Sequence, residues 1–237
     1  MTDTVPYYED FVEIKKKIWS MLNNAVKDRN SQFRIPVFSC GNNDNIESRI
    51  VVLRKSDENN NIVQFHSDIR SDKINILKKN PKASFLFYDK ELKIQVRLKV
   101  EAIINHKNDV TKQSWEKTQH ISRKCYLVDN GPGTISDEPT SGLKPELDNF
   151  DYTKEESEEG YKNFTVIQCK IKSIEWLYLA AKGTPFPLAS VDSENFVASE
   201  NSTSDIVLGC IQSVVVGDSE AHVICQIAKQ IDEKIRP

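Results

Sequence analysis

The stretch LKIQVRLKVEAII, residues 92–104, decides the fold class of this chain. Its first ten residues alternate strictly, with Leu92 opening the apolar series and Lys93 the polar one. Successive side chains of a β-strand point to opposite faces, so this period of two predicts a strand with one dry face and one polar face. It is the clearest strand in the chain, and it favours an architecture built on β-strands.

Shorter β-like runs lie on both sides of this strand, and helical patterns flank them. The β-like runs are FRIPVFSC (33–40), SRIVVLRK (48–55), IVQFHSD (62–68), ASFLFYD (83–89), FTVIQCKIK (164–172) and IEWLYLAA (174–181). Helical patterns cover three segments: 7–30, 70–81 and 107–127. Ser71 or Asp72 can cap the second helix, and Pro81 ends it. We therefore predict a mainly β fold with flanking helices, arranged as a mainly antiparallel barrel.

The last part of the chain is less regular. The segment at about 129–160 is rich in acids and contains several prolines and glycines, so we expect a loop or a disordered insertion there. We expect one domain over 1–181 and a C-terminal extension over 182–237 that packs on it. The extension divides into a loop-like part, a strand or buried segment, and a helix, at 182–205, 205–217 and 220–235.

Composition and charge exclude several classes of protein. The 237 residues carry 32 basic and 35 acidic side chains, and a net charge of -3 argues against a broad nucleic-acid-binding face. No stretch approaches the ~18 apolar residues of a membrane span, and the N-terminus MTDTVPYYEDF is not a secretory signal. Five cysteines without a C-x-x-C pair fit reduced thiols, so we expect a cytoplasmic protein.

Motifs of several common sites are missing from the sequence. The four histidines have no H-E-x-x-H spacing and no cysteine companion, so we expect no metal site. G-x-G-x-x-G and G-x-x-x-x-G-K-[ST] are absent, which disfavours a nucleotide held by a glycine-rich loop, and the nucleophile elbow G-x-S-x-G of many serine hydrolases is also absent. A Ser–His–Asp triad assembled from distant segments stays open, and we name no catalytic residue.

A candidate anion site is visible between residues 49 and 73. Arg49 and Arg54 bracket an apolar strand, and Ser71 and Lys73 stand at the start of the following helix. Arginine is forked and always charged, and the N-terminal end of a helix adds positive potential, so these groups suit a phosphate dianion. The alternative is a solvated strand edge with scattered cations.

The order of four fragments resembles a known family. S-R-I-V-V-L-R, F-H-S-D-x-R-S-x-K, K-x-N-P-K-A and I-Q-V-R-L are together similar to the pyridoxamine 5'-phosphate oxidase family of FMN-binding split barrels, and to its general FMN-binding flavoprotein branch. The resemblance covers roughly residues 7–127 and, more weakly, 163–181. It implies a six-stranded antiparallel split barrel that forms a homodimer, with FMN as the cofactor in clefts between the subunits.

The resemblance also implies which residues bind the cofactor. The phosphate would meet Arg49, Arg54, Ser71 and Lys73, and the ring would lie along the backbone of Val51, Val52 and Leu53. The remaining matches are His66 and Ser67 beside the cofactor, Gln95 on the flavin, and Arg97 on the same strand face. A solvated polar strand face is the alternative for Gln95 and Arg97. Trp176 falls either beside the flavin or in the core.

The chain departs from the vitamin B6 oxidases where these bind their substrate. Their Tyr-x-x-x-Arg-x-x-x-Ser helix is matched only by Trp115, Gln119 and Arg123, so the central arginine is missing. Their Arg-x-His motif is absent from KGTPFPLASVDSENF. Trp115 and Arg123 are therefore only weak candidates for the substrate side. The leading function is an FMN-dependent oxidoreductase of unknown substrate. The alternatives are a non-catalytic flavin or haem module, a true pyridoxamine or pyridoxine 5'-phosphate oxidase, and a structural protein without cofactor.

Overall fold

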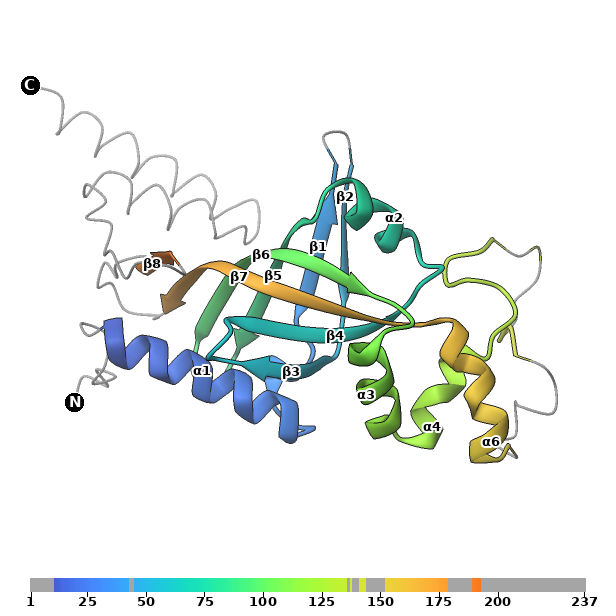
Figure 1. Cartoon of the computed structure of the whole chain (residues 1–237). Helices are drawn as coiled ribbons and strands as arrows, with labels where there is room; N and C mark the ends of the chain where they lie inside the picture. The colour runs from blue at the N-terminus through green and yellow to red at the C-terminus, as the bar shows by residue number, and fades with distance from the viewer. Residues whose placement is uncertain are drawn as a thin grey trace, which may run out of the picture.

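The computed structural model describes residues 11–42, 45–135, 137, 141–143, 152–178 and 189–192. Its strands form one antiparallel sheet, with α1 along one side, α2 at one end and a group of short helices at the other side (Figure 1). The strands are β1 (Val37–Gly41), β2 (Ile46–Ile50), β3 (Leu53–Asp57), β4 (Ile62–Asp68), β5 (Lys82–Asp89), β6 (Ile94–Asn105), β7 (Phe164–Tyr178) and β8 (Ala189–Asp192). The helices are α1 (Phe11–Lys27), η1 (Gln32–Arg34), α2 (Asp72–Lys79), α3 (Asp109–Lys117), α4 (His120–Arg123), η2 (Lys124–Tyr126), α6 (Lys154–Ser157) and η3 (Glu158–Lys162).

The barrel closes through one stretch of chain, residues 46–57. The strands are hydrogen-bonded in the order β2-β1-β5-β6-β7-β4-β3, so β2 and β3 are at opposite ends of this order. Only Val51 and Val52 separate them in the sequence, and the N–H of Val51 donates to the carbonyl of Pro36 at 3.0 Å. The run expected as one strand over 48–55 is thus bent, and it pairs with β1 before the bend and with β4 after it. Counted as one strand it gives the six barrel strands that were expected, and β8 is an addition on β7.

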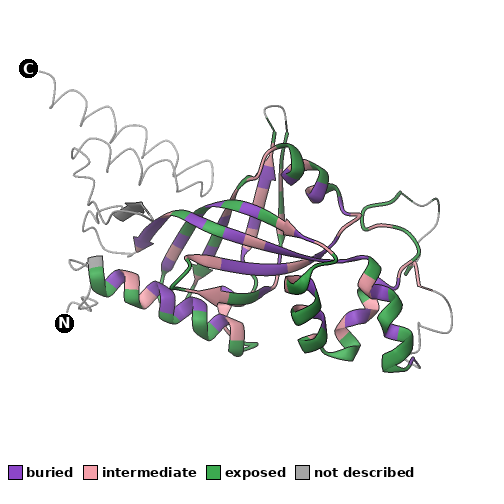
Figure 2. Ribbon diagram, in the orientation of Figure 1, coloured by how far each residue is buried: buried purple, intermediate pink, exposed green. Residues whose placement is uncertain are grey.

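The two longest strands, β6 and β7, can be compared with the strands expected from the sequence. Side chains of β6 alternate between buried and more exposed from Ile94 to Ala102, which confirms the dry and polar faces (Figure 2). The expected start of the strand was wrong, because Leu92 is 42% exposed and Lys93 has a positive φ of 55°. The two runs expected at 164–172 and 174–181 are one continuous strand as far as Tyr178. The apolar pattern breaks because Val100 pairs with Ile171 and Lys99 with Ser173, which is a bulge in the ladder and not a turn.

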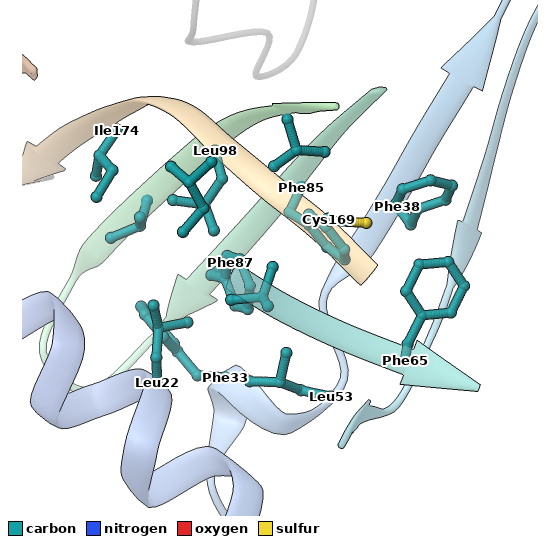
Figure 3. Close-up of a cluster of buried hydrophobic side chains, with 14 of the residues drawn as sticks. Leu22, Phe33, Phe38, Leu53, Phe65, Phe85, Phe87, Leu98, Cys169 and Ile174 are labelled. Atoms are coloured by element: carbon teal, nitrogen blue, oxygen red, sulfur yellow. The ribbon is translucent and has the colours of Figure 1, made fainter. Parts of the chain in front are cut away.

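Aromatic side chains fill the barrel. Phe38, Phe65 and Phe85 are almost fully buried, and the ring centroids of Phe38 lie 4.8 Å from Phe65 and 5.0 Å from Phe85 (Figure 3). The buried face of α1 adds Leu22 to the same core. Trp176 is also buried in this core, which is the second of the two positions considered for it.

The short helices form a lobe with a core of its own. Trp115, Tyr126, Phe164 and Val166 pack together at the end of the barrel where β7 begins. The expectation of a loop over 129–160 is wrong at its end, because α6 and η3 are helical. A capping box explains this start: the hydroxyl of Thr153 accepts from the Glu156 N–H, and the Glu156 carboxylate accepts from the Thr153 N–H.

The C-terminal segments stand mostly outside the described residues. β8 lies within 182–205, where a loop was expected. The strand or buried segment expected at 205–217 and the helix expected at 220–235 both lie outside the described part of the chain. None of the described helices is both long and apolar enough to cross a membrane.

Arg123 and Trp115, the weak candidates for the substrate side, are buried within the lobe. Arg123 is only 2% exposed, and its guanidinium lies 4.4 Å from the centroid of the Trp115 ring. It donates to the Trp115 carbonyl at 2.8 Å and pairs with the Glu158 carboxylate at 2.5 Å. The indole N–H of Trp115 donates to the other Glu158 oxygen at 2.7 Å. These contacts tie α3, α4 and η3 together.

We predict that Arg123→Met destabilises the protein by about 2–3 kcal/mol, because the half-exposed Glu158 loses its buried partner. Urea unfolding followed by fluorescence measures the change. Lys112→Met on the exposed surface of α3 is the control, and it should change the free energy of unfolding by less than about 0.5 kcal/mol. An Arg123→Met protein as stable as this control would show that the cluster does not hold the lobe.

Candidate functional site

A cluster of cationic and hydroxyl groups lies where β4 leads into α2. The ammonium group of Lys73 donates to the hydroxyls of Ser67 and Ser71 at 3.0 and 3.1 Å. These two hydroxyls lie 3.3 Å apart. Ser71 precedes α2 as its N-cap, but its hydroxyl donates to the Asp68 carbonyl at 2.8 Å instead of capping the helix. Three groups that bind phosphate in proteins therefore converge beside the N-terminal end of a helix.

Arg49 completes this cluster from β2. It faces the same side of the sheet as Phe38, its register partner on β1, and its Nη1 lies 3.7 Å from the Cys40 sulfur. Burial lowers the pKa of the Lys73 ammonium, and the nearby charge of Arg49 lowers it further. The two cations are thus close enough to repel, which is the arrangement expected of a site for an anion with more than one charge. We call Arg49, Ser67, Ser71 and Lys73 the phosphate cluster.

Arg54 does not join the phosphate cluster, although it was grouped there from the sequence. Leu53 pairs with Phe65 and Lys55 pairs with Gln64, so Arg54 is the extra residue of a β-bulge. Bulges turn side chains in new directions. Together with the bend at Val51 and Val52, the bulge directs Arg54 into a separate cavity.

This cavity has a volume of about 710 Å³ and lies among α1, β3, β4 and α3. Its described lining has six basic side chains and no acidic one: Lys27, Arg29, Arg34, Arg54, Lys55 and Lys117. Neutral polar groups of β4 and β7 complete it, namely Gln64, His66 and Gln168. Some cations are already engaged, because Arg34 donates to the carbonyls of Ala25 and Val26. Arg54 forms no ion pair with any described residue. We call this space the cationic cavity.

His66 and Ser67 are neighbours on β4 but serve different spaces. Alternation along the strand directs Ser67 to the phosphate cluster and His66 to the cationic cavity. Burial lowers the pKa of His66 to about 3, and the positive charge of Arg54 contributes to the shift. The His66 imidazole is therefore neutral at physiological pH, and it offers one donor and one acceptor but no charge.

Gln95 and Arg97 are not brought to the phosphate cluster of their own chain. They lie on the outer face of β6, opposite Tyr88 and Leu86 of β5. Arg97 is ion-paired with Glu175 of β7. The solvated strand face that was the alternative for both residues describes their position in the single chain.

Val51, Val52 and Leu53, whose backbone was expected to lie along the flavin ring, stand between the two spaces. Val51 and Leu53 are buried, and Val52 is half-buried at the bend. The backbone of this segment runs from the phosphate cluster to the cationic cavity, since Arg49 belongs to the first and Arg54 to the second.

Some residues of both spaces were not singled out from the sequence. Glu47 and Cys40 lie beside Arg49, and the period of two along β2 would have placed Glu47 on the same face as Arg49. Arg29, in the turn after α1, and Arg34, in η1, reach the cavity, and no local pattern indicates this. Within the described residues, no three His, Cys, Asp or Glu side chains are grouped as a metal site.

The sequence and the fold were compared with known proteins. A family model described as pyridoxamine 5'-phosphate oxidase, FMN-binding domain, matches residues 16–106. This span includes the whole phosphate cluster and ends before Trp115 and Arg123. A search of the curated proteins gave no match.

Solved structures share the fold. A pyridoxamine 5'-phosphate oxidase-related, FMN-binding protein from Nostoc punctiforme aligns with a TM-score of 0.55 and 15% identity, over 79% of this chain and 96% of that one. PhzG from Burkholderia lata, solved in complex with tetrahydrophenazine-1-carboxylic acid, aligns with a TM-score of 0.54 and 13% identity, over 81% of this chain and 98% of that one. Residues 16–106 thus match the FMN-binding domain model of pyridoxamine 5'-phosphate oxidase, and the barrel has the same fold as these solved structures.

Proposed function

We propose that the chain is an FMN-dependent oxidoreductase whose phosphate cluster holds the FMN phosphate. The observation that carries this proposal is the convergence of the Lys73 ammonium on the hydroxyls of Ser67 and Ser71, with Arg49 beside it. The donors are those that a phosphate monoester requires, and they lie within the segment that matches an FMN-binding domain. FMN is preferred over FAD in this proposal, because the cluster suits a terminal monophosphate.

FMN, when bound, supplies reversible two-electron transfer, and the chain supplies binding and orientation. In the proposed complex the backbone from Val51 to Leu53 lies along the ring, and no side chain acts as acid, base or nucleophile. Absorbance separates this function from its alternatives: flavin bands that a physiological electron donor bleaches support an oxidoreductase. Flavin bands that only dithionite bleaches support a non-catalytic module, and a Soret band supports haem.

The cationic cavity is the proposed substrate side, and its charge favours an anionic substrate. Lys55 is paired with the Asp57 carboxylate at 3.2 Å, and the other five basic side chains form no ion pair with a described residue, so they hold a surplus that a phosphate or carboxylate group would neutralise. Gln119, which stands where the vitamin B6 oxidases have their central arginine, lines this cavity and accepts from Arg29 at 3.2 Å. Arg54 and Arg34 thus offer charge from other elements in place of the missing arginine.

We also propose that the chain acts as a homodimer through the outer face of β1, β2, β5 and β6. Ile50, Leu86 and Tyr88 are 66%, 38% and 46% exposed there. Ile50 and Leu86 both pair with Val37, so their side chains follow one another across the sheet. Gln95 and Arg97 lie on the same face. A second chain docked on this face would bring the two residues near its own flavin, which a single chain does not do.

We predict that Arg49→Ala and Lys73→Ala each weaken FMN binding roughly tenfold to hundredfold, because each removes a charge-assisted contact with a phosphate. Riboflavin, which has no phosphate, should bind each variant as it binds the unaltered protein. Calorimetric titration of the apoprotein with both flavins, and with FAD, measures this. Lys78→Ala, an exposed cation in the last turn of α2, is the control. Equal weakening of FMN and riboflavin would mean that the cluster is only structural.

We predict that pyridoxine 5'-phosphate binds the flavin-loaded protein at least about tenfold more tightly than pyridoxine, since the basic side chains of the cationic cavity attract its phosphate group. Arg54→Ala should remove most of this difference and leave pyridoxine binding unchanged. Calorimetry is the measurement, because turnover of vitamin B6 substrates is expected to be poor without the Arg-x-His motif. Lys90→Ala, which is exposed and outside the cavity, is the control. Equal affinities for the two compounds would contradict the assignment of the cavity to an anion.

We predict that light scattering of the flavin-loaded protein gives about twice the 27.1 kDa chain mass. Leu86→Asp should give monomers that bind flavin less tightly, because a carboxylate buried in an apolar interface is unfavourable. Ile135→Asp, on a fully exposed loop, should leave the dimer intact. A flavin-saturated monomer in the unaltered protein would refute the dimer.

A further inference from the structure

Glu47 stands inside the phosphate cluster with the wrong charge for a phosphate site. Glu47 and Arg49 are two residues apart on β2, so both side chains lie on one face of the sheet, beside their register partners Cys40 and Phe38 of β1. Their side chains form an ion pair, and 30% of Glu47 and 26% of Arg49 stay exposed. One guanidinium edge of Arg49 is thus occupied by a carboxylate before any ligand arrives.

The negative charge of Glu47 reaches the other members of the cluster. Burial raises the pKa of the Cys40 thiol, Arg49 lowers it, and the Glu47 carboxylate adds a smaller upward contribution. At Lys73, the carboxylates of Glu47 and Asp68 partly offset the effects of burial and Arg49 on the pKa. Asp68 is bound to Arg70 at 2.7 Å, whereas the described ion pair of Glu47 is with Arg49.

We infer that Glu47 competes with the ligand phosphate for Arg49 and so makes the bound FMN exchangeable. Arg49 and Lys73 carry two positive charges and Glu47 removes one, while FMN brings close to two negative charges. A phosphate that takes both cations must displace the Glu47 carboxylate from Arg49 into the solvent that already reaches it. Glu47 thus sets the affinity for the phosphorylated flavin through a repulsive element in the site. This inference rests on the proposed binding of FMN at the phosphate cluster.

The test is the isosteric substitution Glu47→Gln, which keeps the size and polarity of the side chain and removes its charge. FMN should bind the Glu47→Gln apoprotein roughly threefold to tenfold more tightly, and riboflavin should bind both proteins equally. Most of the gain should be a slower release of FMN, measured by stopped-flow displacement. Inorganic phosphate, used as a competitor of FMN, should show a similar gain in affinity for the variant.

Glu13→Gln is the control, because Glu13 is also a carboxylate in an ion pair, 2.7 Å from Lys16, and it lies on α1, outside the phosphate cluster and the proposed docking face. It should bind FMN as the unaltered protein does. Unchanged or weaker FMN binding by Glu47→Gln would overturn the inference. The proposed function would survive that result if Arg49→Ala still weakened FMN and not riboflavin. If neither Arg49→Ala nor Glu47→Gln separates the two flavins, the phosphate cluster itself is misassigned.

Discussion

The bend at Val51 and Val52 is the constraint on which the rest of the structure depends. It allows a single stretch of chain to pair with β1 at one end of the strand order and with β4 at the other, which closes the sheet into a barrel. The sheet closed in this way can enclose the cluster of phenylalanines. The same bend separates Arg49 from Arg54, so the topology that builds the core also divides the cations between two spaces.

Each space then has its own electrostatic character. The phosphate cluster holds cations, hydroxyls and one opposing carboxylate at the end of the barrel that α2 covers. The cationic cavity holds only basic and neutral side chains in its described lining. Burial keeps His66 neutral by lowering its pKa, and Arg54 contributes because a second positive charge beside the arginine is unfavourable. A ligand that spans both spaces would meet fixed charge at each end and a neutral backbone between them.

Much of the barrel could be predicted from the sequence because its signals are local. The alternation along β6 and the cap, lysines and proline around α2 depend only on neighbouring residues. The features that were not predicted depend on pairing with strands that are distant in the chain. The polar break near Ser173 is a bulge that only pairing with β6 reveals, and the bend near Val51 exists because β1 and β4 lie on different sides. The acidic composition near 129–160 favoured the prediction of a loop, although the segment contains the short helix α6 with a capping box of Thr153 and Glu156.

The candidate site shows the same division between local and distant information. Ser71 and Lys73 follow one another at a helix start, so their convergence could be foreseen, whereas the opposite directions of Arg49 and Arg54 could not. Arg123 matched the spacing of a substrate motif only loosely, and the lobe uses it as an internal link. Gln95 and Arg97 lie on the outer face of the barrel, and the barrel wall separates that face from the phosphate cluster of the same chain. If both residues contact a flavin, the flavin belongs to a neighbouring chain, and the exposed apolar side chains beside them are where that chain would dock.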